Sequence, residues 1–263
     1  MAATYIIYNM VKTIFKAIGV TLLLGYLMGA GYLYGFWRSE PRYRGMYITI
    51  DYPSDDAHFV TEASIRQLVE SKPGFRFKGK PYSEVNTLEL AKYIEDKNRL
   101  VRHASCYHTP DSLLRIDIEQ RNPIMRVKSS TLVNADDRHS MADFYIDRDG
   151  AMMPAQFGTA IQLPLVTGFV KARHIQPLHD FALFLKGDDF WSAEITQIYI
   201  RENGDAELIP RIGDHTILIG SFDDTQKKLD NVRIFYDKVL TRKGWNFYKT
   251  INVKFNGQVV GEK

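Results

Sequence analysis

Pairs of aspartates are the first side chains in this sequence that could do chemistry. Two neighbouring carboxylates can serve as general acid and base, or hold a cation. The pairs adjoin expected turns or helix starts, however, where carboxylates cap backbone N–H groups and favour the helix dipole. Capping accounts for every pair, so none is predicted to be catalytic. The pairs are Asp55-Asp56, Asp136-Asp137, Asp188-Asp189 and Asp223-Asp224.

Histidines and the single cysteine are the next candidates, because they are common metal ligands. His103, Cys106 and His108 fall within one expected strand. Side chains alternate between the faces of a strand, so His103 points away from the other two, and two ligands do not make a zinc site. His174 and His179 are five residues apart, which places them about 140° apart around a helix. The sequence therefore predicts no metal site.

Motifs for bound cofactors and for nucleophilic catalysis are also missing. Asp147-x-Asp149-Gly150 begins like a calcium loop but lacks the third ligand and the glutamate at the twelfth position, so it is interpreted as a turn. The sequence contains no phosphate-binding loop and no G-x-S-x-G or S-x-x-K nucleophile motif. We expect no cofactor, no small-molecule substrate and no enzymatic activity.

The elements that position these residues begin with an apolar stretch from Ala17 to Trp37. As a helix it would span roughly 31 Å, close to the bilayer hydrocarbon core of about 30 Å. A cleaved signal peptide is the alternative, because Gly29 and Gly31 are small enough to flank a processing site. We expect a transmembrane helix at 17–37, preceded by a short tail at 1–16 and followed by a juxtamembrane linker at 38–46.

The net charge of +3 belongs to the flanks of this helix. An excess of four positive charges falls within the first 46 residues, and the remaining residues are nearly balanced. No basic stripe remains to follow a phosphate backbone, so nucleic acid is not an expected partner. Because basic residues lie on both sides of the apolar stretch, charge alone leaves the orientation in the membrane open.

Hydrophobic periodicity predicts an α+β fold after the linker. Residues 47–120 show a β-α-α-β-β order, which is typical of a two-layer module with helices on one face of a sheet. Residues 121–263 show short strands, turns and inserted helices, which predict a mostly antiparallel β domain. Its last strand is expected to run from Phe247 to about Val260.

Four short motifs follow one another along most of the chain. They are an R-x-P junction at Arg121 and Pro123 after two strands, a D-x-x-G turn at Asp147 and Gly150, an L-P-x-x-x-G segment at 163–168, and a terminal strand at 251–260. In this order they resemble the FtsQ/DivIB family of bacterial cell-division proteins, in its Bacteroidetes form. The terminal strand departs from the family's D-L-R-Y pattern at Asn252, Lys254 and Phe255.

The resemblance implies a single transmembrane helix, a POTRA domain at 47–120 and a β domain at 121–263, with the bulk of the chain in the periplasm at the division site. It implies a non-enzymatic scaffold of the bacterial inner membrane that binds FtsB- and FtsL-like partners and helps regulate septal peptidoglycan synthesis. Strand addition to the terminal strand is the expected mode of binding. The implied partner-binding residues are Ile251, Val253, Lys254, Phe255, Gly257 and Val259.

Two questions stay open from the sequence. The side chains of Ile251, Val253 and Phe255 could face either the core or a partner, because alternation predicts a buried face in both cases. The protein could also be a membrane-anchored extracytoplasmic enzyme or a POTRA-bearing chaperone or secretion factor. A pocket holding two convergent ionisable groups would favour the enzyme.

Overall fold

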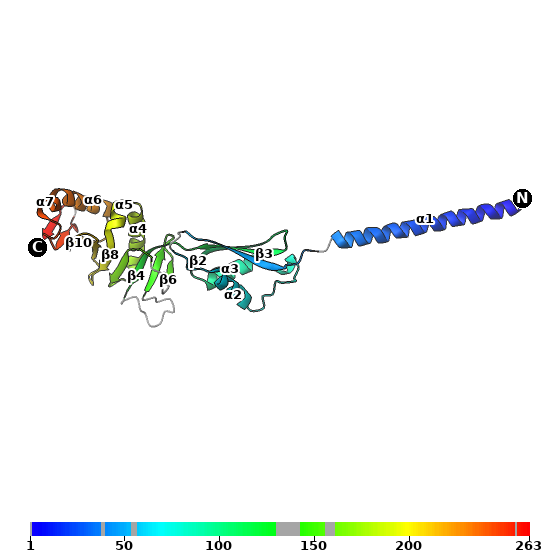
Figure 1. Ribbon diagram of the computed structural model, residues 1–263, viewed down its shortest axis with the longest axis horizontal. Helices are drawn as coiled ribbons and strands as arrows, with labels where there is room; N and C mark the ends of the chain where they lie inside the picture. Colours follow the sequence, from blue (N-terminus) through cyan, green and yellow to red (C-terminus); the bar gives the residue numbers. More distant parts are fainter. Residues whose placement is uncertain (1, 38–39, 54–56, 130–142, 156–160, 256) are drawn as a thin grey trace. The chain divides into compact units, whose positions relative to one another are not determined.

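A long apolar helix and two sheets make up the described part of the chain. The computed structural model describes residues 2–37, 40–53, 57–129, 143–155, 161–255 and 257–263. They form two compact units, one of residues 1–46, 76–86 and 108–114 and one of residues 47–75, 87–107 and 115–263. Helix α1 (Ala2–Trp37) contains a segment, Met10–Gly35, that is long and apolar enough to cross a bilayer (Figure 1). This helix is consistent with a membrane anchor.

The first sheet, called the small sheet, forms from the predicted β-α-α-β-β order, which is confirmed. Among the described residues its three strands are ordered β1-β3-β2, and α2 and α3 pack against one face (Figure 1). Thr61 and Ser64 form a capping box at the start of α2, because each side chain accepts from the other's backbone N–H at 3.2 Å. The elements are β1 (Gly45–Asp51), α2 (Glu62–Ser71), η1 (Tyr82–Glu84), α3 (Thr87–Lys97), β2 (Val101–His108) and β3 (Leu113–Gln120).

The second sheet, called the large sheet, has nine strands within the described residues, ordered β12-β11-β10-β9-β8-β7-β4-β5-β6. Its strands pair mostly antiparallel, as expected, with parallel pairs at β10–β11, β4–β7 and β7–β8. The strands are β4 (Pro123–Lys128), β5 (Asp143–Asp147), β6 (Met152–Pro154), β7 (Leu165–Gly168), β8 (Ile195–Ile200), β9 (Ala206–Pro210), β10 (Thr216–Gly220), β11 (Thr250–Asn252) and β12 (Val260–Glu262).

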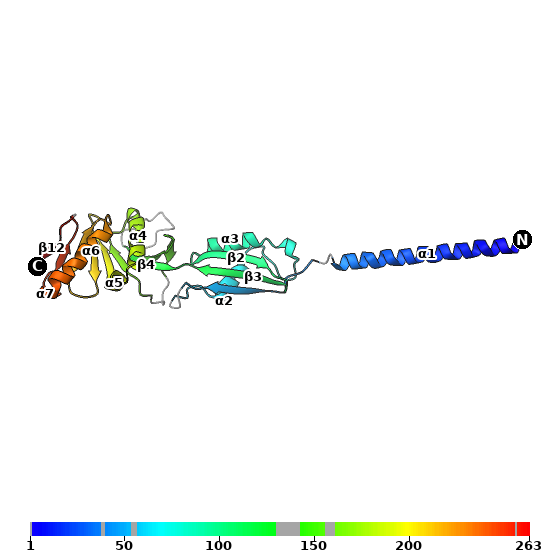
Figure 2. The ribbon, with the colours of Figure 1, turned by 90° about the horizontal axis from the view of Figure 1, so that it is seen from above.

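Helices cover one face of the large sheet and enclose its core. Figure 1 shows α4, α5 and α6 along this face, and Figure 2 shows α6 and α7 at the end where β12 lies. The core includes Phe181 from α4, Trp191 from α5 and Tyr236 from η3. The helices are η2 (Ala172–His174), α4 (Ile175–Lys186), α5 (Asp189–Glu194), α6 (Thr225–Phe235), the π-helix η3 (Tyr236–Leu240) and α7 (Thr241–Lys243).

Two motifs that are separate in the sequence meet in a buried ion pair. Arg121 Nη1 lies 2.8 Å from Asp147 Oδ2, and the Asp147 side chain is 1% exposed. The other oxygen of this carboxylate accepts from the backbone N–H groups of Asp149 at 3.0 Å and Ala151 at 2.7 Å. Gly150 has a φ of +82°, which the turn requires. Asp147 is therefore the organiser of the β5–β6 turn rather than a calcium ligand.

One strand was predicted with wrong bounds, two short elements were missed, and one expected cap bond is absent. The last strand does not run from Phe247 to Val260, because the chain reverses at Gly257, where φ is +74°, and forms the β11–β12 pair. Helix α5 and strand β6 were not predicted, since six and three residues are too few to show a period.

Asp188 caps α5 by accepting from Trp191 N at 3.0 Å, whereas the Asp224 side chain makes no cap bond. The pairs Asp55-Asp56 and Asp136-Asp137 lie outside the described residues.

The two carboxylates of the β5–β6 turn should differ sharply in their effect on stability. Asp147→Ala removes a buried acceptor of three donors and should lower the free energy of unfolding by about 3 kcal/mol. Asp149→Ala, its matched control, removes an ion pair with Arg102 whose side chains are 46% and 44% exposed, and should cost less than about 1 kcal/mol. Chemical denaturation of the detergent-solubilised chain measures both, and equal losses would contradict this role of Asp147.

Candidate functional site

The candidate site is the terminal edge of the large sheet, defined as residues 255 and 257–263. Strand β12 pairs antiparallel with β11 and is the outermost strand of the sheet (Figure 2). In the described part of the chain no strand pairs with the outer side of β12. An edge strand presents backbone groups to which another chain can add.

The hydrogen bonds of β11 determine which of its residues face each neighbour. Val253 N donates to Leu218 O at 3.0 Å, and Thr216 N donates to Lys249 O at 2.9 Å. These bonds run to β10 from the two residues that flank β11, so Ile251, the odd-numbered residue between them, turns its backbone groups toward β10. The even-numbered residues then face β12.

The direction of the backbone groups in β12 follows from this alternation. Thr250 pairs with Glu262, and Asn252 pairs with Val260. Glu262 O also accepts from Lys249 N at 2.7 Å, which confirms that Glu262 faces inward. The N–H and C=O of the residue between, Gly261, must point away from the sheet. Within β12 the outward-facing residue is Gly261, and the same alternation continued past its two ends predicts that Val259 and Lys263 also face outward.

The opposite edge of the large sheet is less suited to strand addition. Strand β6 is three residues long, and its residue Pro154 pairs with Phe144 of β5. Proline has no N–H donor, and prolines blunt sheet edges against further pairing. Of the two outer strands of the large sheet, β12 is therefore the better template for a partner.

Two of the predicted partner-binding residues face the core. Ile251 is fully buried and Val253 is 1% exposed, and both belong to the hydrophobic cluster under the helices. Side chains in this position are not available to a partner. Of the two readings that the sequence left open, the structure places these two side chains in the core.

Lys254 is engaged in a contact within the chain. Its Nζ lies 2.7 Å from Asp205 Oδ2, and its aliphatic part lies against Gly220, where an added Cβ would come within 2.7 Å of it. Burial raises the pKa of Asp205, but hydrogen bonds from Lys254 and Asn203 outweigh it and hold that pKa below its usual value. Lys254 therefore fastens the end of β11 to the β8–β9 turn.

The remaining predicted residues lie at the terminal edge. Phe255 is 60% exposed, Gly257 forms the turn, and Val259 is half-buried and packs against the core cluster. The sequence prediction missed Val260, which is 45% exposed, and Gly261. The missed signal is the dipeptide Asn256-Gly257, which is typical of a hairpin turn.

Gly261 lets an aromatic side chain hold β12 in place. A Cβ at position 261 would come within 2.5 Å of the Tyr248 ring, so the ring lies directly over this glycine. Tyr248 packs in turn on Phe235 of α6, with ring centroids 5.5 Å apart. Beside it, Phe247 lies under the ammonium groups of Lys243 and Lys263, at 5.7 and 4.7 Å from its centroid. Strand β12 is thus exposed at its outer side but held in place by the packing of Tyr248.

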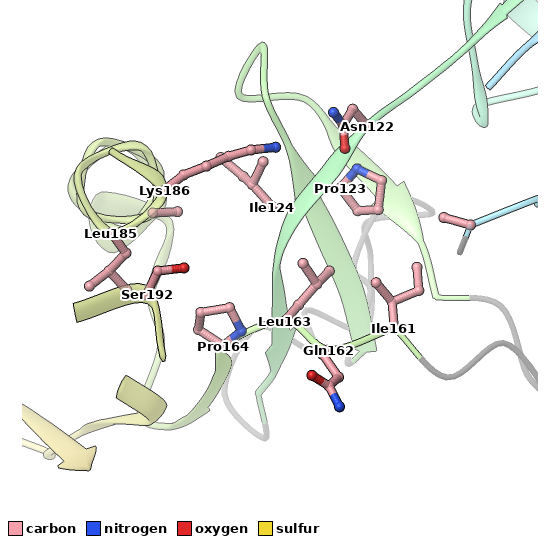
Figure 3. Close-up of a pocket in the computed structure, with 12 residues that line it drawn as sticks. Asn122, Pro123, Ile124, Ile161, Gln162, Leu163, Pro164, Leu185, Lys186 and Ser192 are labelled. Atoms are coloured by element: carbon pink, nitrogen blue, oxygen red, sulfur yellow. The ribbon is translucent and has the colours of Figure 1, made fainter. Parts of the chain in front are cut away.

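A cavity of about 680 Å³ opens beside the Leu163-Pro164 segment (Figure 3). Figure 3 shows Pro164 below Leu185 and Ser192, with Asn122 and Pro123 across from them. Among the described residues that line it, Lys186 is the only ionisable side chain. Two convergent ionisable groups, which would favour an enzyme, do not line this cavity.

A second cavity, of about 640 Å³, does hold ionisable groups, between the start of α4 and the β8–β9 and β10–α6 turns. Two of them are held by contacts within the chain. Asp205 binds Lys254, and His174 Nδ1 accepts from Lys171 N at 3.1 Å. Burial, together with Arg173 and Lys171, lowers the pKa of His174. These contacts give Asp205 and His174 structural roles.

The side chains around Cys106 also have structural contacts. Burial, together with Asp117 and Glu95, raises the pKa of Cys106 to about 12, so its thiol stays protonated. His103 Nδ1 lies 2.8 Å from Glu95 Oε1. No group of three or more potential metal ligands occurs among the residues that the structure describes.

Comparison with known families identifies both folded parts. Residues 122–262 match the model described as FtsQ/DivIB, C-terminal related, and residues 44–119 match the POTRA-like domain model. The first match covers more than half of the chain. A search of curated proteins found no match.

Alanine substitutions should separate the core-facing residues from the exposed one. Ile251→Ala creates a cavity in the core and should lower the free energy of unfolding by about 2–5 kcal/mol. Phe255→Ala removes a side chain that is 60% exposed and should change it by less than about 1 kcal/mol. Denaturation of the detergent-solubilised chain measures both. A large loss for Phe255→Ala would show that this residue is part of the core.

Proposed function

Because the chain belongs to the FtsQ/DivIB family, a family of non-catalytic cell-division scaffolds, we propose that it is a membrane-anchored divisome scaffold. In this proposal it binds FtsB- and FtsL-like partners, with a partner strand adding to β12, and helps regulate septal peptidoglycan synthesis. It acts without enzymatic activity, cofactor or metal. Helix α1 holds it in the bacterial inner membrane at the division site, with the bulk of the chain in the periplasm.

The outer side of β12, with which no strand of the described residues pairs, carries this proposal. Val259, Gly261 and Lys263 direct backbone groups away from the sheet, where an added strand can pair with them. Main-chain hydrogen bonds of this kind give affinity without requiring a particular partner sequence. Each is worth about 0.5–1.5 kcal/mol.

Specificity would come from the exposed side chains beside the edge. Phe255 and Val260 are 60% and 45% exposed and lie on the turn and on β12. Covering an exposed apolar side chain contributes about 25 cal/mol for each Å² removed from water. Of the six residues expected from the sequence, we keep Phe255, Gly257 and Val259 as partner-contacting and assign Ile251, Val253 and Lys254 to holding the edge.

Removing one outward-facing donor tests strand addition. Val259→Pro eliminates a backbone N–H of the terminal edge, and a missing hydrogen bond in a buried ladder costs about 1–3 kcal/mol. We expect co-purification with an FtsB-like partner to fall at least about fivefold. Val259→Ala is the matched control, because it trims the same side chain and keeps the N–H. Circular dichroism of both variants checks that the domain is folded.

Two outcomes would contradict strand addition at β12. One is unchanged partner binding by folded Val259→Pro, and the other is an equal loss in Val259→Ala. A pull-down from membranes of the native bacterium tests the scaffold role itself, since recovery of no division proteins would show that the proposed function is wrong.

The orientation of the chain is tested by a reporter fused after Lys263. Alkaline phosphatase folds and is active only outside the cytoplasm, because it needs disulfides. With the bulk of the chain in the periplasm, the fusion should be active, whereas a fluorescent reporter that requires the cytoplasm should be dark. The reverse pattern would overturn the proposed orientation.

A further inference from the structure

We propose that a basic surface next to α1 binds the headgroups of anionic phospholipids in the membrane that holds the helix. The basic surface consists of Arg42, Arg44, Arg76 and Lys78, and all four residues are exposed. It comes from two stretches of the chain, Arg-Tyr-Arg at 42–44 and Arg-Phe-Lys at 76–78. This inference rests on the proposed anchoring of α1 and is independent of partner binding at β12.

Backbone hydrogen bonds bring the two stretches together. Tyr43 N donates to Lys80 O at 3.0 Å, and Gly79 N donates to Tyr43 O at 2.8 Å. Arg42 Nη1 donates to Gly79 O at 2.9 Å, and Arg42 forms an isolated bridge with Pro81. Residues far apart in the sequence therefore form one local surface within the same compact unit.

Aromatic residues between the cations turn inward and fix this surface. Tyr43 is 1% exposed, and its ring lies 6.1 Å from Phe77 and 4.6 Å from Tyr82, centroid to centroid. In each stretch an inward aromatic residue separates two exposed cations, so successive side chains alternate as on an extended strand. The four positive charges consequently stand on the outer side of a packed aromatic cluster.

These charges are not neutralised by neighbouring carboxylates. Glu40 accepts from Ser83 N at 2.9 Å and from Ser83 Oγ at 2.7 Å. Glu84 lies 3.3 Å from Lys80 Nζ. Among the residues that the structure describes, no acidic side chain forms an ion pair with a member of the basic surface. Its positive charge is available to an anionic partner.

The length of the chain keeps this surface close to the bilayer. Helix α1 ends at Trp37, and Arg42 follows five residues later. Five extended residues reach at most about 18 Å, whereas the polar headgroup region extends roughly 5–8 Å beyond the hydrocarbon core. Arg42 therefore cannot move far from the headgroups, whichever way the linker points. This tether favours a lipid surface over an acidic protein segment.

The strength of the attraction follows from the number of cations. Each lysine or arginine near an anionic membrane contributes about fivefold in binding, which corresponds to about 1 kcal/mol. Removing two of the four should shift the equilibrium between the lipid-bound and the free surface by at least tenfold. High salt should have the same effect, because the Debye length falls to about 3 Å at 1 M.

Hydrogen exchange of the full chain in nanodiscs tests the proposal. Discs contain either phosphatidylcholine alone or phosphatidylcholine mixed with the anionic lipid phosphatidylglycerol. We expect deuterium uptake of peptides covering residues 74–80 to be several-fold slower in the anionic discs. The difference should disappear in 1 M salt and in the double variant Arg76→Gln/Lys78→Gln.

The matched control is Lys92→Gln/Lys97→Gln, which removes two exposed charges from α3, outside the basic surface, and should keep the slow uptake. Equal uptake in the two kinds of disc would overturn the proposal, as would loss of the effect in the control. Slowing by polyglutamate but not by anionic lipid would also overturn it and assign the surface to an acidic protein segment. Failure of the chain to enter discs would instead contradict the anchoring by α1.

Discussion

The carboxylate of Asp147 is the group on which the start of the large sheet depends. A buried carboxylate is stable only when its lone pairs are used, and here Arg121 and two backbone N–H groups use them. Its partner Arg121 directly follows Gln120, whose side-chain oxygen accepts from Phe59 N at 2.7 Å and Val60 N at 3.0 Å. Gln120 and Arg121, neighbours in the sequence, thus order a loop and a turn that lie far apart along the chain. The turn joins β5 to β6 at one side of the large sheet.

Within the described residues, the two outermost strands of the large sheet differ. One end is β6, where Pro154 removes a backbone N–H donor. The other end is β12, which is held by the Tyr248 ring and by its neighbour β11. Lys254 in turn fastens the end of β11 through its ion pair with Asp205. A free edge is an aggregation liability, and a short strand keeps this liability small. In the proposed function the same short strand would receive a partner strand.

Much of the fold could be predicted because local physics decides it. Capping at Thr61 and the turn at Gly150 each act within a few residues, and the β-α-α-β-β order and the Asp147–Gly150 turn were predicted correctly. The terminal strand was predicted wrongly because a period of two continues through Ile251, Val253 and Phe255 as if they shared one face. The reversal at Gly257 ends that face after Val253, so Phe255 is exposed instead.

The contacts that decide the candidate site were beyond sequence reasoning for a different reason. Lys254 meets Asp205 across 49 residues, and the parallel pairing of β10 with β11 requires the whole of α6 between them. Neither leaves a local pattern. The basic surface was likewise divided between two stretches that become neighbours only through the bonds of Tyr43. Sequence patterns therefore located the edge. They could not tell which of its residues face the core, which fasten the edge to the rest of the sheet, and which are exposed.

If the terminal edge binds a partner as proposed, its modest size would make a membrane tether important. Three or four added backbone hydrogen bonds supply about 3–4 kcal/mol, which corresponds to a Kd of about 1 mM or weaker. Exposed Phe255 and Val260 add to this, but a free partner in solution would still be bound weakly. A partner anchored in the same bilayer meets the edge at an effective concentration of about millimolar order, which matches that affinity. In the proposed function, binding at β12 would then depend on both proteins being held in one membrane, so the anchor would contribute to partner selection as well as to location.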